Sequence, residues 1–249
     1  MDSEVIGFEG VSFSYGSQLV LDNTTFLIEK NDFFGIIGPN GGGKTTIIKL
    51  ILGFLKPDSG EILLFGKNNP YAGELKRIGY VPQRASNFDQ NFPATVFEVA
   101  STGRYAKVGI MKGLSRHDNE IVEKSLATVD MLNLRDKRIG DLSGGQQQRV
   151  FIARALTAEA EVLILDEPLA GVDMQSQEKF YELLKSLNKD AGLTVILVSH
   201  DIGMISKSVT KLACVNVKVT VHDVSKGITG ADLTCAYSEG LSRVPHHHD

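Results

Sequence analysis

Three short segments of the sequence carry residues that could bind or activate a phosphate group. The first, Gly38–Thr46, is glycine-rich and fits the pattern G-x-x-x-x-G-K-[ST]. An apolar run at 33–37 precedes it and a helix-forming stretch at 46–52 follows it, so the segment joins a strand to a helix. Glycines let backbone N–H groups approach phosphate oxygens, and the helix start adds a partial positive charge. We expect Lys44 to reach the β- and γ-phosphates and Thr45 to ligate magnesium.

We refer to the segment Gly38–Thr46 as the phosphate loop. The flanking strand and helix argue against the alternative, a glycine-rich surface turn. The residues of the phosphate loop are Gly38, Pro39, Asn40, Gly41, Gly42, Gly43, Lys44, Thr45 and Thr46.

The second segment is an apolar run, Val162–Glu167, that ends in two carboxylates. In an open parallel sheet, ligands gather at the carboxyl ends of the strands, so this acidic pair would face the phosphate loop. We expect Asp166 to hold the magnesium ion and Glu167 to polarise the attacking water. Taken alone, the run could equally be a strand that meets a solvated loop. His200 follows a similar strand at 194–199; a solitary histidine is often structural, but this position favours a contact to the γ-phosphate.

The third segment, Leu142–Gln146, reads LSGGQ and precedes a stretch of good helix formers at 147–156. Ser143 would cap that helix, and the glycines would leave its first N–H groups open to an anion. An ordinary helix cap is the alternative. One active site does not obviously need a second phosphate-seeking helix start. The sequence therefore predicts a site that is shared between two copies of the chain.

In this order, the motifs resemble those of the nucleotide-binding subunits of ABC transporters, over about residues 4 to 222. The resemblance implies that Tyr15 stacks on adenine, that Gln83 contacts magnesium and water, and that Asp173 lies in the loop that crosses the dimer seam. It makes His200 the switch histidine. In this family two subunits sandwich two ATP molecules with magnesium, each using its own phosphate loop and the partner's signature residues, which here would be Ser143, Gly144, Gly145 and Gln146. ATP hydrolysis then drives transport.

Two positions depart slightly from the family pattern. Gly42 stands where alanine or serine is common, and Leu169 follows Asp-Glu-Pro where threonine is frequent. Neither position carries the chemistry, so we expect hydrolysis to be retained.

The resemblance implies an α/β fold: a P-loop NTPase (RecA-like) core with a parallel sheet, an N-terminal antiparallel β-subdomain and an inserted α-helical subdomain. We expect one ABC nucleotide-binding domain over 1–249. Its parts would be an antiparallel part at about 1–32, the core at 33–82 and 157–215, the helical subdomain at 83–156 and a C-terminal extension at 216–249. Alternation of polar and apolar residues at 5–15 and 19–30 supports the antiparallel part.

Composition excludes several other classes. The chain has 249 residues, 42% of them hydrophobic, and a net charge of −4 without a long basic run, which does not suggest nucleic-acid binding. No apolar run approaches membrane-spanning length and the N-terminus lacks a signal-peptide pattern, so any membrane attachment would come through a partner. The resemblance then implies a peripheral protein on the cytoplasmic face of the membrane. Cys214 and Cys235 are too few for a disulfide framework, and we expect free thiols.

The stretches 88–96 and 101–104 resemble the subfamily that imports zinc, manganese or iron. We therefore expect an ATPase subunit that energises a divalent-metal importer as a homodimer through ATP. Polytopic permease subunits would dock on the region after Gln83, and an extracytoplasmic solute-binding protein would act indirectly. A helical insertion that any importer could carry is the alternative. His246, His247 and His248 are either a native metal-binding tail or the remnant of a purification tag.

Other functions fit less well. An importer of a different solute and a soluble ABC ATPase of iron–sulfur assembly remain as alternatives. Soluble ABC ATPases of chromosome upkeep usually need coiled-coil arms, and those of translation need two nucleotide modules; the sequence has neither. A nucleotide kinase or a GTPase leaves LSGGQ and Asp173 unexplained.

Overall fold

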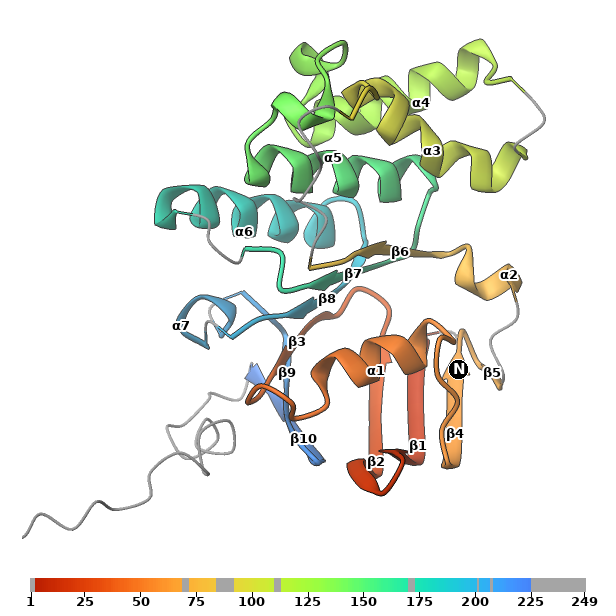
Figure 1. The fold of residues 1–249 in the computed structure, drawn as a ribbon, viewed down its shortest axis with the longest axis vertical. Helices are drawn as coiled ribbons and strands as arrows, with labels where there is room; N and C mark the ends of the chain where they lie inside the picture. The colour runs from red at the N-terminus through yellow and green to blue at the C-terminus, as the bar shows by residue number, and fades with distance from the viewer. Residues whose placement is uncertain are drawn as a thin grey trace, which may run out of the picture.

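The fold consists of two sheets and a layer of helices (Figure 1). It was obtained as a computed structural model, which describes residues 3–68, 72–83, 92–109, 113–169, 173–200, 202–206 and 208–224. Among the described residues, none of the helices has both the length and the apolar character needed to cross a bilayer.

The smaller sheet is antiparallel, with strand order β2-β1-β4-β5. Its strands are β1 (Glu4–Tyr15), β2 (Gln18–Glu29), β4 (Ser59–Leu64) and β5 (Lys67–Asn68). The β1–β2 hairpin confirms the expected antiparallel pair. A stack of rings joins this sheet to the larger one: the Phe26 ring lies 4.5 Å from Phe8 and 5.7 Å from Phe34, centroid to centroid.

The larger sheet has the strand order β10-β9-β3-β8-β7-β6 and is parallel except for β10. Its strands are β3 (Phe33–Ile37), β6 (Ile78–Val81), β7 (Val162–Asp166), β8 (Thr194–Val198), β9 (Lys211–Asn216) and β10 (Lys218–Asp223). Every residue of β3, β7 and β8 is buried, as expected for parallel strands covered on both faces. The carboxyl ends of these three strands therefore meet at one edge.

Helices cover both faces of this sheet (Figure 1). On one face lies α1 (Lys44–Ile51), and on the other lie α5 (Gly144–Thr157) and α6 (Met174–Lys189). Successive side chains of a strand point to opposite faces. On β7, Leu163 accordingly packs in the cluster that includes α5 and α6, whereas Ile164 packs in the cluster that includes α1.

A helical layer stands above the sheet in Figure 1. It contains α3 (Val96–Val108), α4 (Arg116–Thr128) and α5, with single 3-10 turns η1 (Leu132–Leu134) and η2 (Ile139–Asp141). A capping box of Ser115 and Asp118 starts α4, and an equivalent box of Thr95 and Glu98 starts α3. The short helices α2 (Ala72–Leu75) and α7 (Ile202–Ile205) lie elsewhere in the chain.

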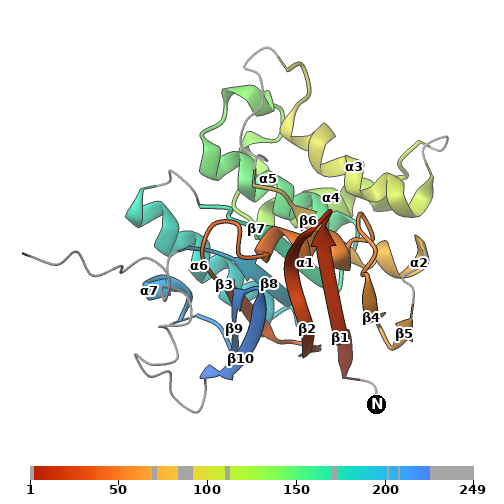
Figure 2. The same ribbon diagram turned by 60° about the horizontal axis from the view of Figure 1, so that its bottom comes forward.

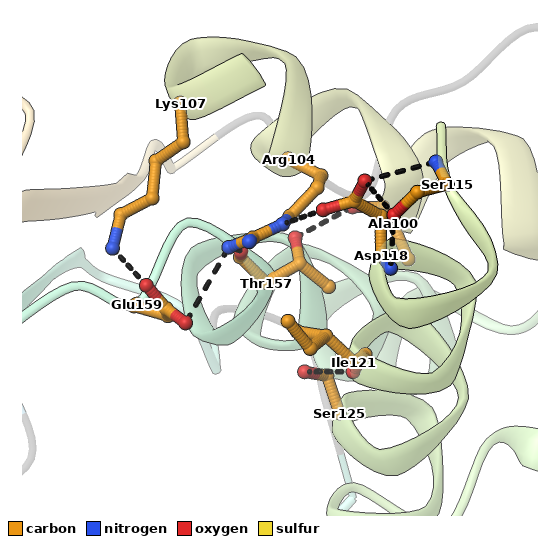
Figure 3. Close-up of polar contacts among 9 residues, drawn as sticks. All are labelled: Ala100, Arg104, Lys107, Ser115, Asp118, Ile121, Ser125, Thr157 and Glu159. Carbon is orange, nitrogen blue, oxygen red and sulfur yellow. Dashed lines mark hydrogen bonds and ion pairs between the residues drawn. The ribbon is translucent and has the colours of Figure 1, made fainter. Parts of the chain in front are cut away.

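A nearly buried ion pair fastens the three long helices of this layer to one another (Figure 3). Arg104 on α3 donates from Nε to Asp118 Oδ1 at the start of α4 (2.7 Å), and its Nη1 lies 3.4 Å from Glu159 Oε1, just beyond α5. Lys107 also pairs with Glu159. Thr157 Oγ1, at the end of α5, donates to Ala100 O of α3 (2.8 Å). The end of α5 is thus fixed to both α3 and α4.

Two segments lie outside the parts to which the sequence assigned them. Strands β4 and β5 fall within the range 33–82 predicted for the core, yet they extend the antiparallel sheet, because the chain returns after α1 to the free edge of β1. Strand β10 falls in the range 216–249 predicted as an extension, yet it pairs with β9 in the core sheet. Figure 2 shows β10 running beside β2, where Asp22 N donates to Val217 O (2.9 Å).

The prediction of free thiols is wrong at Cys214, which is disulfide-bonded. Cys235 and the histidines at 246–248 lie outside the described residues, as does the chain from 84 to 91.

Candidate functional site

A cavity of about 380 Å³ lies at the carboxyl end of β3. It brings together the phosphate loop, the aromatic residue of β1, the glutamine after β6 and the glutamate after β7. The lining residues are Tyr15, Gln18, Val20, Asn40, Gly41, Gly43, Lys44, Thr45, Thr46, Gln83 and Glu167. Sequence reasoning missed Gln18 and Val20. The signal was the hairpin: Gln18 pairs directly with Tyr15, so β2 had to supply the adjacent wall.

The phosphate loop leaves the start of α1 open. Gly43 is the N-cap of α1 with φ 109°, a left-handed conformation that favours glycine, and no side chain caps the helix there. The first N–H groups of α1 are therefore available to an anion. Lys44 Nζ donates to the carbonyl oxygens of Gly38 (2.9 Å) and Pro39 (3.0 Å), so the ammonium lies across the mouth of the loop. Burial lowers the pKa of Lys44, while Glu167 and Asp166 oppose that shift.

The two carboxylates, Asp166 and Glu167, lie in different environments. Asp166 ends β7 and is 4% exposed; burial first, and then the neighbouring Glu167, raise its pKa, whereas Lys44 and Lys49 lower it. Glu167 has a φ of 46°, a left-handed conformation that costs energy outside glycine. That bend turns the Glu167 side chain into the cavity, away from the direction of the strand.

Three strand ends converge on the Glu167 carboxylate. Gln83 Nε2, after β6, donates to Glu167 Oε2 (2.9 Å). His200 Nδ1, after β8, lies 4.0 Å from the same oxygen, and the Glu167 backbone N–H donates to Val198 O (3.0 Å). The predicted grouping of Gln83, Glu167 and His200 is therefore present in the geometry. Such a carboxylate, held by an amide, can accept a proton from water beside a bound phosphate.

The signature segment Leu142–Gln146 lies elsewhere. Ser143 caps α5: its hydroxyl oxygen accepts from Gln146 N (3.4 Å), and its own N–H donates to Gln146 Oε1 (3.0 Å). A hydroxyl oxygen that accepts a hydrogen bond still carries a proton that it can donate to an external anion. None of Ser143, Gly144, Gly145 and Gln146 lines the cavity, and α5 lies across the sheet from α1 (Figure 1). Asp173 is also outside the lining and caps α6 through Ser176 N (3.0 Å).

The donor set in the cavity fits magnesium. Thr45 and Gln83 line the cavity and offer a hydroxyl oxygen and an amide oxygen, whereas Asp166, directly before Glu167, is buried and is not among the lining residues. Magnesium prefers oxygen ligands and is commonly held by one or two carboxylates together with substrate phosphates. Thr45 and Gln83 provide oxygen ligands of this kind, and Asp166 would add the carboxylate.

A strand, a glycine-rich loop with its lysine, a helix start and carboxylates at the end of β7, a parallel strand of the same sheet, define a P-loop protein that binds nucleoside triphosphates. Comparison with known proteins gives the family. The model of the family described as "ABC transporter" matches residues 21–170. The chain belongs to this family, and it is an ATP-binding and ATP-hydrolysing subunit.

Individual relatives agree with this assignment. The chain is 43% identical to the zinc uptake system ATP-binding protein ZurA of Listeria innocua over 217 residues, which cover 87% of this chain and 84% of the relative. It is 37% identical to the manganese transport system ATP-binding protein MntB of Listeria monocytogenes, covering 93% of this chain and 95% of the relative. The resemblance to the metal-importing subfamily is thereby confirmed.

A solved structure supports the fold. The dimeric post-hydrolysis state of the ATP-binding cassette MJ0796, bound to ADP and Pi, superposes with a TM-score of 0.73 and 26% identity, covering 88% of this chain and 99% of that one. The predicted α/β P-loop fold is confirmed by such neighbours. That relative is a dimer with nucleotide products bound.

Proposed function

We propose that two copies of this chain enclose two ATP molecules and that hydrolysis drives a membrane importer of zinc or manganese. One observation carries the proposal: Lys44 and Glu167 share a cavity, while the anion-seeking cap at Ser143 lies on the other side of the sheet. Within a single copy, the groups of the cavity and the cap at Ser143 therefore do not meet. The transported solute is inferred from the relatives, which are named for zinc uptake and manganese transport.

The residues of the cavity divide the chemistry among them. Lys44 exchanges its two carbonyl partners for oxygens of the β- and γ-phosphates, which return an opposite charge to a partly buried ammonium. Glu167 accepts the proton of the attacking water, and Gln83 holds the carboxylate in place. His200 contacts the γ-phosphate from the end of β8. Tyr15, 46% exposed at the cavity, stacks on adenine.

Magnesium supplies positive charge that neutralises the β- and γ-phosphate oxygens. Thr45, Gln83 and Asp166 are the residues that would hold it. Asp173 and the partner's Ser143, at the helix caps, would close the seam between the two copies. The γ-phosphate is the differential ligand, because it can bridge the copies only before hydrolysis.

A second cavity supports a permease dock. It measures about 530 Å³ and lies between β6, α3 and α5, with small residues on its walls. They include Gly79, Gly103, Ala106, Ala155 and Ala158. Tyr80, three residues before Gln83, also lines it, so β6 and the residues directly after it connect the two cavities. We assign it to a helix of the membrane permease, which would place the chain on the cytoplasmic face, with a solute-binding protein acting from outside.

Replacing the base tests the composite site. We expect Glu167→Gln to leave ATP affinity intact, to lower turnover at least about 100-fold, and to trap a dimer at saturating ATP and magnesium. Calorimetric ATP titration and light scattering after size exclusion measure the two properties. Lys44→Ala, which should lose ATP affinity, is the control. A Glu167→Gln protein that stays monomeric with ATP bound would contradict the proposal.

Growth assays test the solute and the dock together. A deletion strain should fail in metal-depleted medium and recover with added zinc or manganese, and the wild-type gene should restore growth. Ala106→Glu should fail to restore it because a charge would enter the groove, while the purified variant keeps its ATP affinity. Recovery by neither metal would remove the metal assignment. Co-purification with a soluble assembly and no membrane protein would favour the iron–sulfur alternative.

A further inference from the structure

The side chain of Gln147, one residue beyond the signature segment, is turned inward. Gln147 is 3% exposed. Its Nε2 donates to two backbone carbonyls, Ile139 O (3.0 Å) and Leu142 O (3.3 Å). Both acceptors lie in the chain that leads into α5: Ile139 starts η2, and Leu142 directly precedes the cap Ser143. One side chain therefore spans the approach to the helix and its second turn.

This contact takes the place of a common apolar one. In many helices the residue before the N-cap packs against the fourth helical residue and fixes the angle at which the chain enters. Here those positions are Leu142 and Gln147, and a hydrogen bond from the glutamine amide joins them. A hydrogen bond constrains direction more strictly than an apolar contact does. The cap residue between them is held accordingly.

The glutamine is not the choice that stability alone would favour. Among the described residues its Oε1 is buried without a hydrogen-bond partner, and a buried acceptor left unpaired is costly. A leucine or methionine would fill the same space without that cost. Unlike those residues, the glutamine has two N–H donors, and they donate to the carbonyl oxygens of Ile139 and Leu142, in the segment before α5.

We propose that Gln147 is a positioning residue for the ATP site of the partner copy: it sets the position of Ser143 and of the first N–H groups of α5. This inference rests on the proposed function, since only in a dimer does Ser143 meet a nucleotide. Gln147 itself touches no substrate in this account. Its loss should impair closure of the dimer and leave the chain's own phosphate loop unaffected.

Gln147→Met tests the inference, because methionine matches the size and removes both donors. Gln148→Met is the matched control: Gln148 is its neighbour on α5, is 2% exposed, and among the described residues its Oε1 likewise has no partner. Both are made in the Glu167→Gln background. We expect unchanged ATP affinity in each, a dimer dissociation constant raised about tenfold by Gln147→Met, as for the loss of one to two positioning bonds, and a change below about twofold with Gln148→Met.

Mixing supplies a readout that simple misfolding would not give. With native Glu167 in both chains, a Gln147→Met chain has an intact phosphate loop, and a Lys44→Ala chain has an intact signature segment. Together they form one complete site, so the mixture should hydrolyse ATP faster than either variant alone. Equal losses with Gln147→Met and Gln148→Met, reduced ATP affinity of the Gln147→Met monomer, or no gain on mixing would overturn the inference. If Glu167→Gln with native Gln147 never dimerises, the proposed function fails instead.

Discussion

At the scale of single residues, the backbone of β9 determines what the phosphate loop can contain. A Cβ on Gly38 would lie 2.0 Å from Val215 O, and one on Gly42 would lie 2.8 Å from the same oxygen. Real Cβ atoms do not approach that closely, so the loop or the β9–β10 turn would have to shift. The sequence showed glycine at 42 as a departure from the usual alanine or serine. The structure supplies its reason, which is the close approach of a backbone carbonyl.

Gly42→Ala should therefore damage the loop although alanine fits the general family pattern at this position. We expect a loss of roughly 1–3 kcal/mol in unfolding free energy, as for overpacked sites, and a weaker affinity for ATP. Urea denaturation and ATP titration measure the two effects. Gly73→Ala is the control, since a Cβ there meets nothing within 4 Å. If Gly42→Ala changed neither the unfolding free energy nor the ATP affinity, the β9–β10 turn would have shifted without loss of stability, which would contradict this prediction.

At the scale of elements, α5 is fixed at both ends. Its start is held by the Ser143 cap and by Gln147, and its end is joined through Arg104 to α3 and to the start of α4 (Figure 3). The helix can therefore move only together with its neighbours. Residues of α3 and α5 also line the cavity assigned to the permease. A movement of a permease helix bound there would therefore displace α3, α5 and Ser143 together.

Asp118, which joins the start of α4 to α3 through Arg104, should make the stability of the protein depend on pH. A hydrogen bond from the Ser115 hydroxyl, then the Arg104 guanidinium, lowers the pKa of Asp118 from 3.8 to about 2. A lowered folded-state pKa contributes stability that is present above the unfolded value and is lost as the pH falls through the folded value. Asp118→Asn should thus be less stable than the parent at pH 7, and the difference should shrink between about pH 5 and pH 2.

Thermal unfolding of both proteins across that range gives the test. Glu120→Gln serves as the control on the same helix, because Glu120 pairs with Arg116 in an exposed i,i+4 position and such pairs contribute little. A gap between Asp118→Asn and the parent that does not depend on pH would mean that the carboxylate's charge is unimportant at this junction.

Local patterns predicted much of the fold and the groups of the site, but not the non-local pairings. The phosphate loop, the carboxylates at the end of β7 and the cap at Ser143 depend on neighbours within a few residues, so the sequence alone predicted each of them. The places of β4 and β10, and the pairing of Arg104 with Asp118, depend on contacts between distant segments. Gln147 was read only as a helix former, because nothing in a local pattern tells which side chains turn inward to bond a backbone carbonyl.

At the scale of the whole molecule, the separation of the two phosphate-seeking helix starts by the sheet is the decisive feature. The start of α1 opens into the cavity and the start of α5 does not. No local rearrangement brings them together, since both helices pack on a sheet whose core strands are buried on both faces. In the proposed dimer, the ATP site closes when a second copy brings its α5 to this cavity.

Proximity between copies can be read directly by crosslinking. Asn40→Cys and Gly145→Cys place thiols on the phosphate loop and on the first turn of α5; position 40 is exposed, and a Cβ at 145 meets nothing within 4 Å. In a Glu167→Gln background with Cys214→Ser and Cys235→Ser, oxidation should yield a covalent dimer on denaturing gels when ATP and magnesium are present, and little without them. Asn40→Cys combined with Arg116→Cys, a fully solvated position on α4, should give none. Absence of the 40–145 crosslink under every nucleotide condition would contradict the shared site, whereas a crosslink that forms equally well without ATP would show that the γ-phosphate does not control closure.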